Sequence, residues 1–542
     1  MLPRLWGNCR GKNVPSGALE VNGTGRFSDI DDAFLDYLAG LGFSHVWYTG
    51  IICHSTKTSS AGCHASHAHF VKGEAGSPYA IRDYHDVNPY LADNPESRME
   101  EFEALVQRTH NHGLKLIIDF VPNHVARDYR DSMNTAGLKG LGDGDDNSVH
   151  WTAGNDFFYY PGEKLRLPMT EAIREELERK GLEPYSELPA KASGNIFSPE
   201  PGVCDWYETI KINWCDFHNP TWDKMAEILD FWASKGVDGF RCDMVELVPP
   251  EAFSWLISTL KKKYDKLIFI AEVYRKDLYS KYLRQVGFDL LYDKSGLYDT
   301  LRAIVEKNTG DNPGYPVAYK ESARAVTGWW QGLGEVQDGM LNFLENHDEQ
   351  RFGSDFFGHD ARNSVAALAV SLFFNRASFM LYFGEEVGER GMDSEGFSGC
   401  DGRTSIFDWW RVDSLARLQR CIKDGDVGMS YLKPAEKQVF ERYSEALKLA
   451  SESKAVRLGE SYDLCWCNEN SRGFNKDRHF CFLRSHQGKC LLFACNFARE
   501  SADFHVDIPV SAYEFLGLGK EIKPSCEISL PPFEACCLDL TD

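Results

Sequence analysis

The sequence has no apolar run long enough to cross a membrane. Its longest such run, AALAVSLFF at 366–374, is shorter than the roughly 20 residues that a spanning helix needs. The opening residues, MLPRLWGNCRGKN, also lack the apolar core of a secretory signal peptide. These absences predict a protein that neither enters a membrane nor is exported, and we expect it in the cytoplasm.

Basic residues are also in short supply. The chain has 59 Lys and Arg against 81 Asp and Glu, which gives a net charge of −22. A surface this acidic repels phosphate backbones and anionic lipid headgroups, so we expect neither nucleic acid nor a membrane as a partner. The charge also serves solubility, and by itself it identifies no ligand.

Cysteine is not scarce, with 16 residues, but no disulfide pattern is visible. Some thiols stand singly in apolar runs, as Cys242 and Cys490 do, while Cys536 and Cys537 are adjacent. We interpret them as reduced, buried side chains in a reducing compartment. The segment at 53–69 is rich in Cys and His, but its spacing fits no common zinc pattern; a zinc site there is the alternative to a polar substrate loop.

The chain alternates between helical and strand patterns. Its 542 residues exceed one ordinary core and suggest two or three domains. Apolar stripes at 28–42, 97–113 and 219–236 predict half-buried helices, each of which ends near a glycine and precedes a short apolar strand. The alternation continues to residue 450, which predicts parallel strands in a barrel or a doubly wound sheet.

Two regions break this alternation. Residues 125–212 have no clear periodicity and predict an inserted domain, so that the barrel itself would comprise 1–124 and 213–450. From residue 455 onward, alternating strands and turns predict a C-terminal all-β domain over 455–542.

Charged residues stand at the ends of four predicted strands. In GVDGFRCDMVEL, at 236–247, Arg241 and Asp243 share one face of a strand because side chains alternate along it. Burying such charges is costly unless they have a partner or a function. The other three strand ends contribute the acids Asp119, Glu272 and Asp348.

Four carboxylates that converge at one end of a barrel would repel one another. The repulsion raises the pKa of at least one of them, so that it holds a proton at neutral pH. A protonated carboxyl beside an ionised one is the pair that glycoside cleavage uses. One such acid could belong to a structural ion pair, but four together favour an active site at the carboxyl ends of the strands.

The motifs DFVPNH, GFRCD, AE and ENHD, in this order, resemble the signature regions of the α-amylase family of retaining glycoside hydrolases (family 13), over residues 1–450. The resemblance implies an α/β fold: a (β/α)8 TIM barrel with an inserted domain after strand 3 and a C-terminal all-β sandwich domain. It implies a glycosidase that cleaves α-1,4-glucosidic bonds in maltodextrin, starch or glycogen, with an α-glucan oligosaccharide as its partner.

The resemblance also assigns roles to individual residues. Asp243 would be the nucleophile, Glu272 the general acid and base, and Asp348 the acid that stabilises the transition state. The substrate pocket would be formed or braced by Tyr79, Asp83, Asp119, His124, Arg241, His347 and Arg351. Asn123 stands where the family places a calcium ligand, so Ca2+ is the one cofactor implied, and no organic cofactor is.

Two departures from the family pattern concern the site. Glu246 and Leu247 stand where many starch-acting members have Lys and His. We expect Glu246 to reach the cleft rim and bind sugar hydroxyls, while substrate length and calcium dependence stay open. The chain also begins at Met1 with most of the first strand's apolar residues absent, so either a stub closes the barrel or native residues are missing.

Two alternatives to hydrolysis stay open on the sequence. If a sugar hydroxyl replaces water as the acceptor, the same site gives a 4-α-glucanotransferase or another transglycosylase. A non-enzymatic glucan-binding protein is the other alternative, but it is disfavoured because all three catalytic carboxylates are present.

Overall fold

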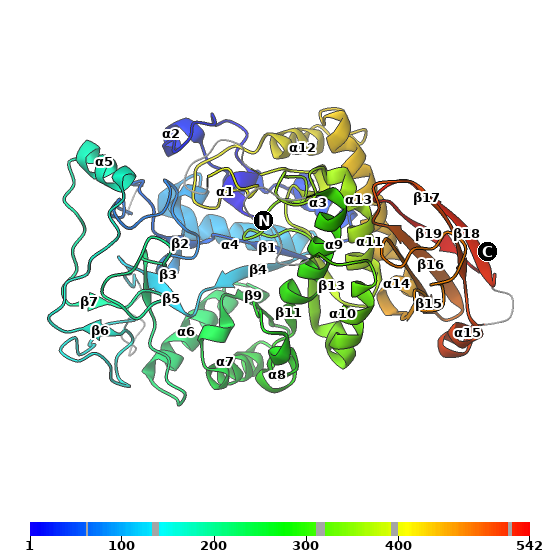
Figure 1. Ribbon diagram of the computed structural model, residues 1–542. Coiled ribbons are helices and arrows are strands. Elements are labelled where there is room, and N and C mark those ends of the chain that lie inside the picture. Colours follow the sequence, from blue (N-terminus) through cyan, green and yellow to red (C-terminus); the bar gives the residue numbers. More distant parts are fainter. Residues whose placement is uncertain (61–62, 133–139, 311–319, 392–398, 519–522, 542) are drawn as a thin grey trace.

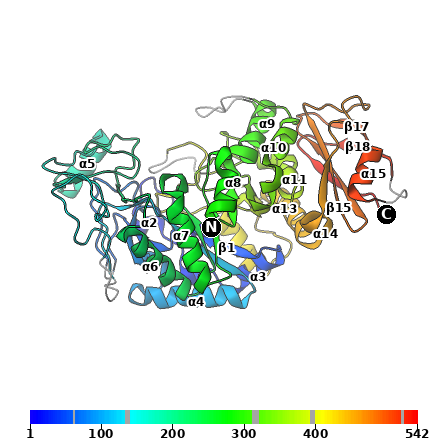
Figure 2. The same cartoon turned by 90° about the horizontal axis from the view of Figure 1, so that it is seen from below.

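A computed structural model describes residues 1–60, 63–132, 140–310, 320–391, 399–518 and 523–541 (Figure 1). The molecule is elongated, with an α/β body between an irregular segment at one end and a β-rich segment at the other (Figures 1 and 2). Among the helices in these ranges, none has both the length and the apolarity to cross a bilayer.

Seven parallel strands form the central sheet in the order β1, β4, β9, β10, β11, β12, β13. Their bounds are β1 His45–Tyr48, β4 Lys115–Phe120, β9 Gly239–Cys242, β10 Ile268–Ala271, β11 Leu290–Tyr292, β12 Met340–Phe343 and β13 Ser378–Met380. In register, Arg241 of β9 pairs with Asp119 of β4 on one side and with Ile270 of β10 on the other. Because the strands are parallel, all their carboxyl ends meet at one edge of the sheet.

Helices surround this sheet (Figures 1 and 2). They are α1 Pro3–Trp6, α2 Leu19–Asn22, α3 Asp32–Gly40, α4 Arg98–Asn111, α6 Pro220–Ser234, α7 Pro250–Lys263, α8 Tyr279–Lys281, α9 Asp299–Thr309, α10 Ala325–Leu333, α11 Val365–Phe373, α12 Asp413–Lys423 and α13 Pro434–Glu452. The three helices predicted from apolar stripes are confirmed as α3, α4 and α6. Each is followed by a glycine of positive φ, namely Gly42, Gly113 or Gly236, a conformation that favours glycine.

The gap between β1 and β13 lies where an eighth barrel strand is expected. Met1 alone pairs there: its amino group donates to the Trp47 carbonyl at 2.6 Å, and the Thr49 amide donates to the Met1 carbonyl at 2.8 Å. A cavity of about 260 Å³ lies beside this contact, and the side chains that line it include Val46 of β1 and Phe379 of β13. Within the described residues, the backbone contacts of Met1 are the pairing observed at the place of the first barrel strand.

The segment inserted between β4 and α6 has little regular structure. Its elements are β5 His124–Ala126, β6 Tyr159–Tyr160, α5 Glu171–Lys180, β7 Ala190–Lys191 and β8 Thr209–Lys211. β5 pairs with β8 and β6 with β7, both antiparallel. The hairpin of β2 Ile52–His54 and β3 Ile81–Val87 packs against β5, which anchors the inserted segment beside the carboxyl edge of the barrel.

The C-terminal segment is an antiparallel β structure, as the sequence predicts. One sheet has the order β14 Glu460–Asp463, β15 His479–His486, β16 Lys489–Asn496 and β19 Ala535–Asp539; a second pairs β17 Ala502–Asp507 with β18 Ser525–Leu530. The short helices are α14 Lys454–Leu458 and α15 Val510–Leu516. Phe374, which follows α11, packs against Phe480 and Phe482 of β15 and so joins this segment to the barrel.

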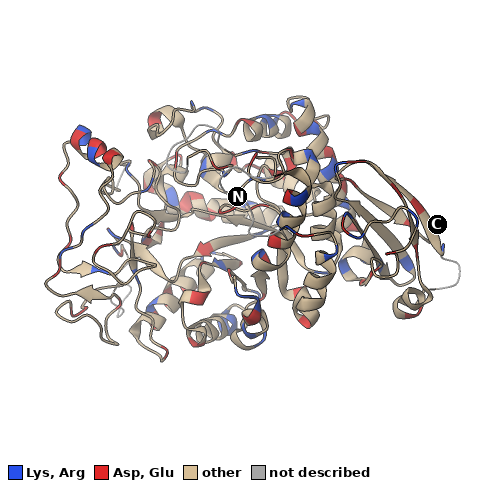
Figure 3. Ribbon diagram, in the orientation of Figure 1, with Lys and Arg blue, Asp and Glu red and all other residues tan. Residues whose placement is uncertain are grey.

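Charges of both signs are mixed along the chain, whereas eight of the sixteen thiols lie in the C-terminal β segment. Figure 3 shows acidic and basic residues interspersed on the helices, and α5 carries both signs. All sixteen cysteines are free thiols, and Cys242 and Cys490 are fully buried, as expected of small apolar side chains.

Candidate active site

A cavity of about 270 Å³ opens at the carboxyl edge of the barrel and is lined by six of the twelve predicted site residues. Asp243 follows β9, Glu272 follows β10, and Asp348 lies beyond the end of β12. The predicted residues that line the cavity are Tyr79, His124, Asp243, Glu272, His347 and Asp348. The parallel strands thus bring three acids, far apart in sequence, to one place.

The guanidinium of Arg241 joins these acids. It is completely buried, with Nη1 2.6 Å from Asp243 Oδ1 and 3.6 Å from Asp119 Oδ1. Its Nη2 lies 3.0 Å from Glu272 Oε1, an ion-pair distance without the alignment of a hydrogen bond. One cation therefore holds both Asp243 and Glu272, which explains why a charged residue lies inside the barrel.

Aromatic rings enclose the same guanidinium. The ring centres of Trp47, Tyr79 and Tyr292 lie 5.3, 5.4 and 5.4 Å from its central carbon, within the range of cation–π attraction. Arg241 Nε also donates to the Tyr292 hydroxyl at 3.2 Å. The rings exclude water, so the ion pairs act in a medium of low polarity where they are strong.

Several buried carboxyls surround this single cation, and the pKa values of Asp243 and Asp348 are raised. Burial and the neighbouring Glu272 carboxylate raise the pKa of Asp243 well above its usual value, although Arg241 opposes the shift. Desolvation and Glu272 also raise the pKa of Asp348, whose side chain keeps 44% of its surface open to the cleft. The group therefore retains a proton at a pH where isolated carboxyls are ionised.

Two neutral imidazoles face the acids. Burial and Arg241 lower the pKa of His347 well below its usual value, and burial and Lys211 lower that of His124 to about 3. The ring of Tyr79 stacks on His347 at 5.1 Å between centroids, with its hydroxyl 2.7 Å from His347 Nε2. A neutral imidazole can donate through one nitrogen and accept through the other, as sugar hydroxyls require.

Three of the predicted residues lie behind the cavity wall. Asp119 accepts a hydrogen bond from Trp47 Nε1 at 3.0 Å, and Asp83 accepts one from the His85 amide at 3.0 Å. Arg351 is buried and donates to Glu345, to Thr404 and to the Phe383 carbonyl. These three side chains do not line the cavity, and their role as braces of the pocket stays a prediction.

Glu246 lies outside the cavity lining, contrary to our expectation that it reaches the cleft rim. Its carboxylate accepts hydrogen bonds from the backbone amides of Tyr274 and Arg275, in the loop that follows Glu272. The physical reason is local: those amides point away from any strand partner and need an acceptor. Leu247 is 41% exposed.

Several residues of the site escaped sequence reasoning. Tyr274 donates to Glu272 Oε1 at 2.6 Å, and its spacing of two from Glu272 was the available signal, since strand neighbours of that spacing share a face. The other lining residues that were not predicted are Lys72, Ser77, Trp206, Glu208, Thr209, Met244, Ile406 and Phe407. Lys72 and Glu208 form an ion pair at 2.9 Å.

The predicted calcium ligand does not fit a divalent ion. Asn123 is buried, and its Oδ1 accepts a hydrogen bond from Lys211 Nζ at 2.8 Å. Within the described residues, no carboxylate forms an ion pair with Lys211. Calcium sites need several oxygen ligands, usually including carboxylates, whereas a cation already stands at this amide oxygen. We therefore derive no step through calcium.

Among the described residues of 53–69, the Cys and His side chains form no group of three that could hold zinc. His54 contacts Arg4 and Asn88, while His69 contacts the Pro168 carbonyl. In the described part of the chain, the one convergent group is Asp83, His85 and Asp131, with ligand atoms within 4.8 Å. Although burial opposes it, hydrogen bonds to Asp131 and Glu227 raise the pKa of His85 to about 9, so an internal cation already balances these acids.

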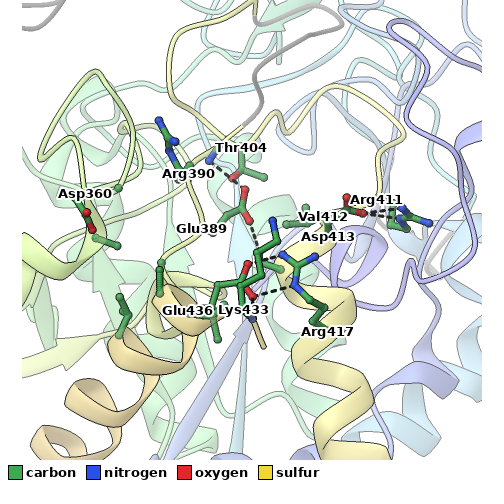
Figure 4. A pocket seen from close by; sticks show the side chains of 18 of the residues that line it. Asp360, Glu389, Arg390, Thr404, Arg411, Val412, Asp413, Arg417, Lys433 and Glu436 are labelled. Atoms are coloured by element: carbon green, nitrogen blue, oxygen red, sulfur yellow. Dashed lines mark hydrogen bonds and ion pairs between the residues drawn. The ribbon is translucent and has the colours of Figure 1, made fainter. Parts of the chain in front are cut away.

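A larger cavity, of about 530 Å³, lies away from the three acids, between residues 387–391, α12 and the start of α13 (Figure 4). Two ion pairs join charged side chains of its lining: Arg417 with Glu436 at 2.9 Å and Arg411 with Asp413 at 2.7 Å. None of the three catalytic candidates lines it, so we assign the chemistry to the smaller cavity.

Comparison with known proteins agrees with this geometry. The family model "Alpha amylase, catalytic domain" matches residues 19–486. Cyclomaltodextrin glucanotransferase of Geobacillus stearothermophilus is 24% identical over 396 residues, covering 69% of this chain and 47% of that protein. Oligo-1,6-glucosidase of Halalkalibacterium halodurans is 21% identical over 90% of each chain. An acarbose-soaked debranching enzyme of Nostoc punctiforme shares the fold, with a TM-score of 0.63, 18% identity and coverage of 99% of this chain and 97% of that one.

The chain belongs to the α-amylase family, since the family model covers most of its length. The resemblance seen in the motifs is thereby confirmed. The chain spans about half the length of the first curated relatives that it matches.

Replacing Asp243 with asparagine should change how stability depends on pH. Folding raises the pKa of Asp243, so the stability that this carboxyl contributes is fully present below its usual pKa, near pH 4. That contribution is lost as the pH rises through the raised pKa of the folded state. Asparagine does not titrate, so the variant does not lose this stability. The Tm of the variant minus that of wild type should therefore increase from pH 4.5 to pH 8. The exposed Asp216→Asn serves as the control and should show no trend. A relative Tm of Asp243→Asn that stays flat or falls with pH would contradict the shift.

Proposed function

We propose that this protein is a retaining glycosidase that cleaves α-1,4-glucosidic bonds in maltodextrin- or glycogen-type oligosaccharides. One observation carries the proposal: Asp243 and Glu272, at the ends of adjacent parallel strands, share the guanidinium of Arg241 and line the same cavity. In retaining enzymes the two carboxyls lie closer together than in inverting ones, and a shared guanidinium favours the closer spacing.

The proposed reaction has two displacements. In the first, Asp243 attacks the anomeric carbon, while Glu272 protonates the leaving glycosidic oxygen as the bond to it breaks. In the second, Glu272 takes a proton from water, whose oxygen displaces Asp243 from the anomeric carbon. The anion is the form of Asp243 that attacks, and the hydrogen bond from Arg241 Nη1 favours it against the burial and the Glu272 charge that raise the pKa of Asp243.

The cavity walls suit a sugar ring. Tyr79 and His347 form a flat stacked pair, and aromatic faces of this kind pack against the apolar face of a pyranose. His124 and Asp348 also line the cavity and can bind hydroxyl groups. We assign Asp348 to the hydroxyls of the reacting sugar, where its charge would stabilise the cationic transition state.

The proposal also specifies the acceptor of the sugar, which is water, and the bond that is cleaved, which is α-1,4. A relative named as a glucanotransferase supports transglycosylation, and one named as an oligo-1,6-glucosidase supports cleavage of α-1,6 bonds. Either activity uses the same covalent intermediate. Hydrolysis of α-1,4 bonds remains our proposal, and both alternatives are outcomes of its test.

The test follows the products formed from maltoheptaose. We expect shorter maltodextrins only, with Asp243→Asn slower by about 10⁴-fold or more, because loss of a nucleophile removes that much rate. Products longer than maltoheptaose would show transglycosylation instead. Cleavage of panose with no cleavage of maltoheptaose would show α-1,6 specificity, and near-native activity of Asp243→Asn would contradict the nucleophile.

We further propose that Glu246 positions the acid–base rather than binding sugar. By accepting from the Tyr274 and Arg275 amides it fixes the loop whose Tyr274 hydroxyl donates to Glu272. A second donor to Glu272 is the Met244 amide, which lies 2.8 Å from Oε2. Together these contacts set the direction of the Glu272 carboxyl.

Replacing Glu246 with alanine should therefore lower kcat by about tenfold with little change in KM, because misplacement of a catalytic group slows the chemical step. Glu246→Gln keeps a carbonyl oxygen for the amides and should recover most of the rate. Leu247→Ala, at the exposed neighbouring position, is the matched control. If Glu246→Ala instead raises KM and alters the product pattern at unchanged kcat, the residue binds sugar.

A further inference from the structure

The junction between the barrel and the inserted segment contains a partly buried ammonium group. Asn123 immediately precedes β5, and Lys211 ends β8, the strand that pairs with β5. Lys211 Nζ lies 2.8 Å from Asn123 Oδ1 and 3.4 Å from the Gly194 carbonyl oxygen. Asn123 Nδ2 donates to the same carbonyl at 2.9 Å, so the three groups form a closed triangle.

One aromatic ring also contacts this ammonium. The ring of Phe197 lies 5.6 Å from Lys211 Nζ, which adds a cation–π contact. No carboxylate in the described part of the chain pairs with it. The neutral oxygens of Asn123 and Gly194 thus face one monovalent cation that the chain itself supplies.

Two physical arguments exclude a divalent ion at these oxygens while Lys211 is charged. Two positive ions cannot share two oxygen atoms a few ångströms apart, since their repulsion in a partly buried site is large. A calcium ion also prefers six to eight oxygen ligands, with carboxylates among them, and this junction offers amide and carbonyl oxygens only.

We propose that the ammonium of Lys211 takes the place of a divalent cation at this junction, so that the protein neither binds nor requires calcium at Asn123. The consequence reaches the active site, because His124 directly follows Asn123, is the register partner of Lys211 and lines the catalytic cavity. An internal cation holds that histidine in place irrespective of the metal supply.

The test measures thermal unfolding and needs no activity, so its outcome is independent of the proposed reaction. Wild-type protein should unfold at the same temperature, within about 1 °C, in EDTA and in 5 mM calcium chloride. Elemental analysis after dialysis against calcium should find no bound ion. A chelator-dependent loss of several degrees, or one calcium per chain, would overturn the proposal.

Charge-reversal variants make the test specific. Lys211→Asp puts a carboxylate beside Asn123 and Gly194, so calcium at 100 times its dissociation constant should raise the Tm of this variant by about 2 °C. Lys211→Met removes the charge without adding a ligand and should not respond. Lys164→Asp makes the same charge change at an exposed position of the inserted segment and should not respond either.

The variants also decide the proposal where folding is impaired. If Lys211→Asp folds and calcium does not raise its Tm, the ammonium of Lys211 does not occupy a cation site and the proposal fails. If that variant does not fold with or without the ion, calorimetric titration of wild-type protein with calcium decides. Binding with a dissociation constant below about 1 mM then overturns the proposal, and no binding supports it.

Discussion

A fully buried guanidinium must be neutralised by groups that the fold itself brings to it, and this requirement organises the centre of the protein. Arg241 meets it through Asp243 and Glu272, with Asp119 slightly farther away. The parallel register of β4, β9 and β10 sets these positions, because the three acids stand at or just beyond paired strand ends. The same contacts that make the burial of Arg241 tolerable therefore assemble the acids that do the chemistry.

Much of this centre could be predicted from the sequence because it depends on local rules. Alternation along a strand places Arg241 and Asp243 on one face, and helix stripes ending at Gly42, Gly113 and Gly236 indicate the repeated strand–helix unit. The contacts of Glu246 were not predictable in this way. Its partners are backbone amides of another loop, and backbone amides carry no signature in the sequence.

The inserted segment shows the same limit more strongly. Its short strands β5 and β8 lie more than 80 residues apart in sequence, and their pairing is what sets Lys211 against Asn123. A family motif marks Asn123 as a calcium ligand, whereas the ammonium that occupies its oxygen comes from a region without periodicity. The two internal cations thus differ: Arg241 is balanced by acids that perform chemistry, whereas Lys211 is held by neutral oxygens and a ring.

The central claim is that Asp243, held by Arg241, forms a covalent bond to the sugar. The most direct measurement is to trap that bond with 5-fluoro-α-glucosyl fluoride, whose fluorine at C5 slows both displacements, and to locate the adduct by peptide mass spectrometry. The account predicts one glucosyl adduct, carried by the peptide that contains Asp243 and absent from Asp243→Asn. An adduct on a different residue, or turnover of the reagent to an inverted product without any adduct, would contradict it.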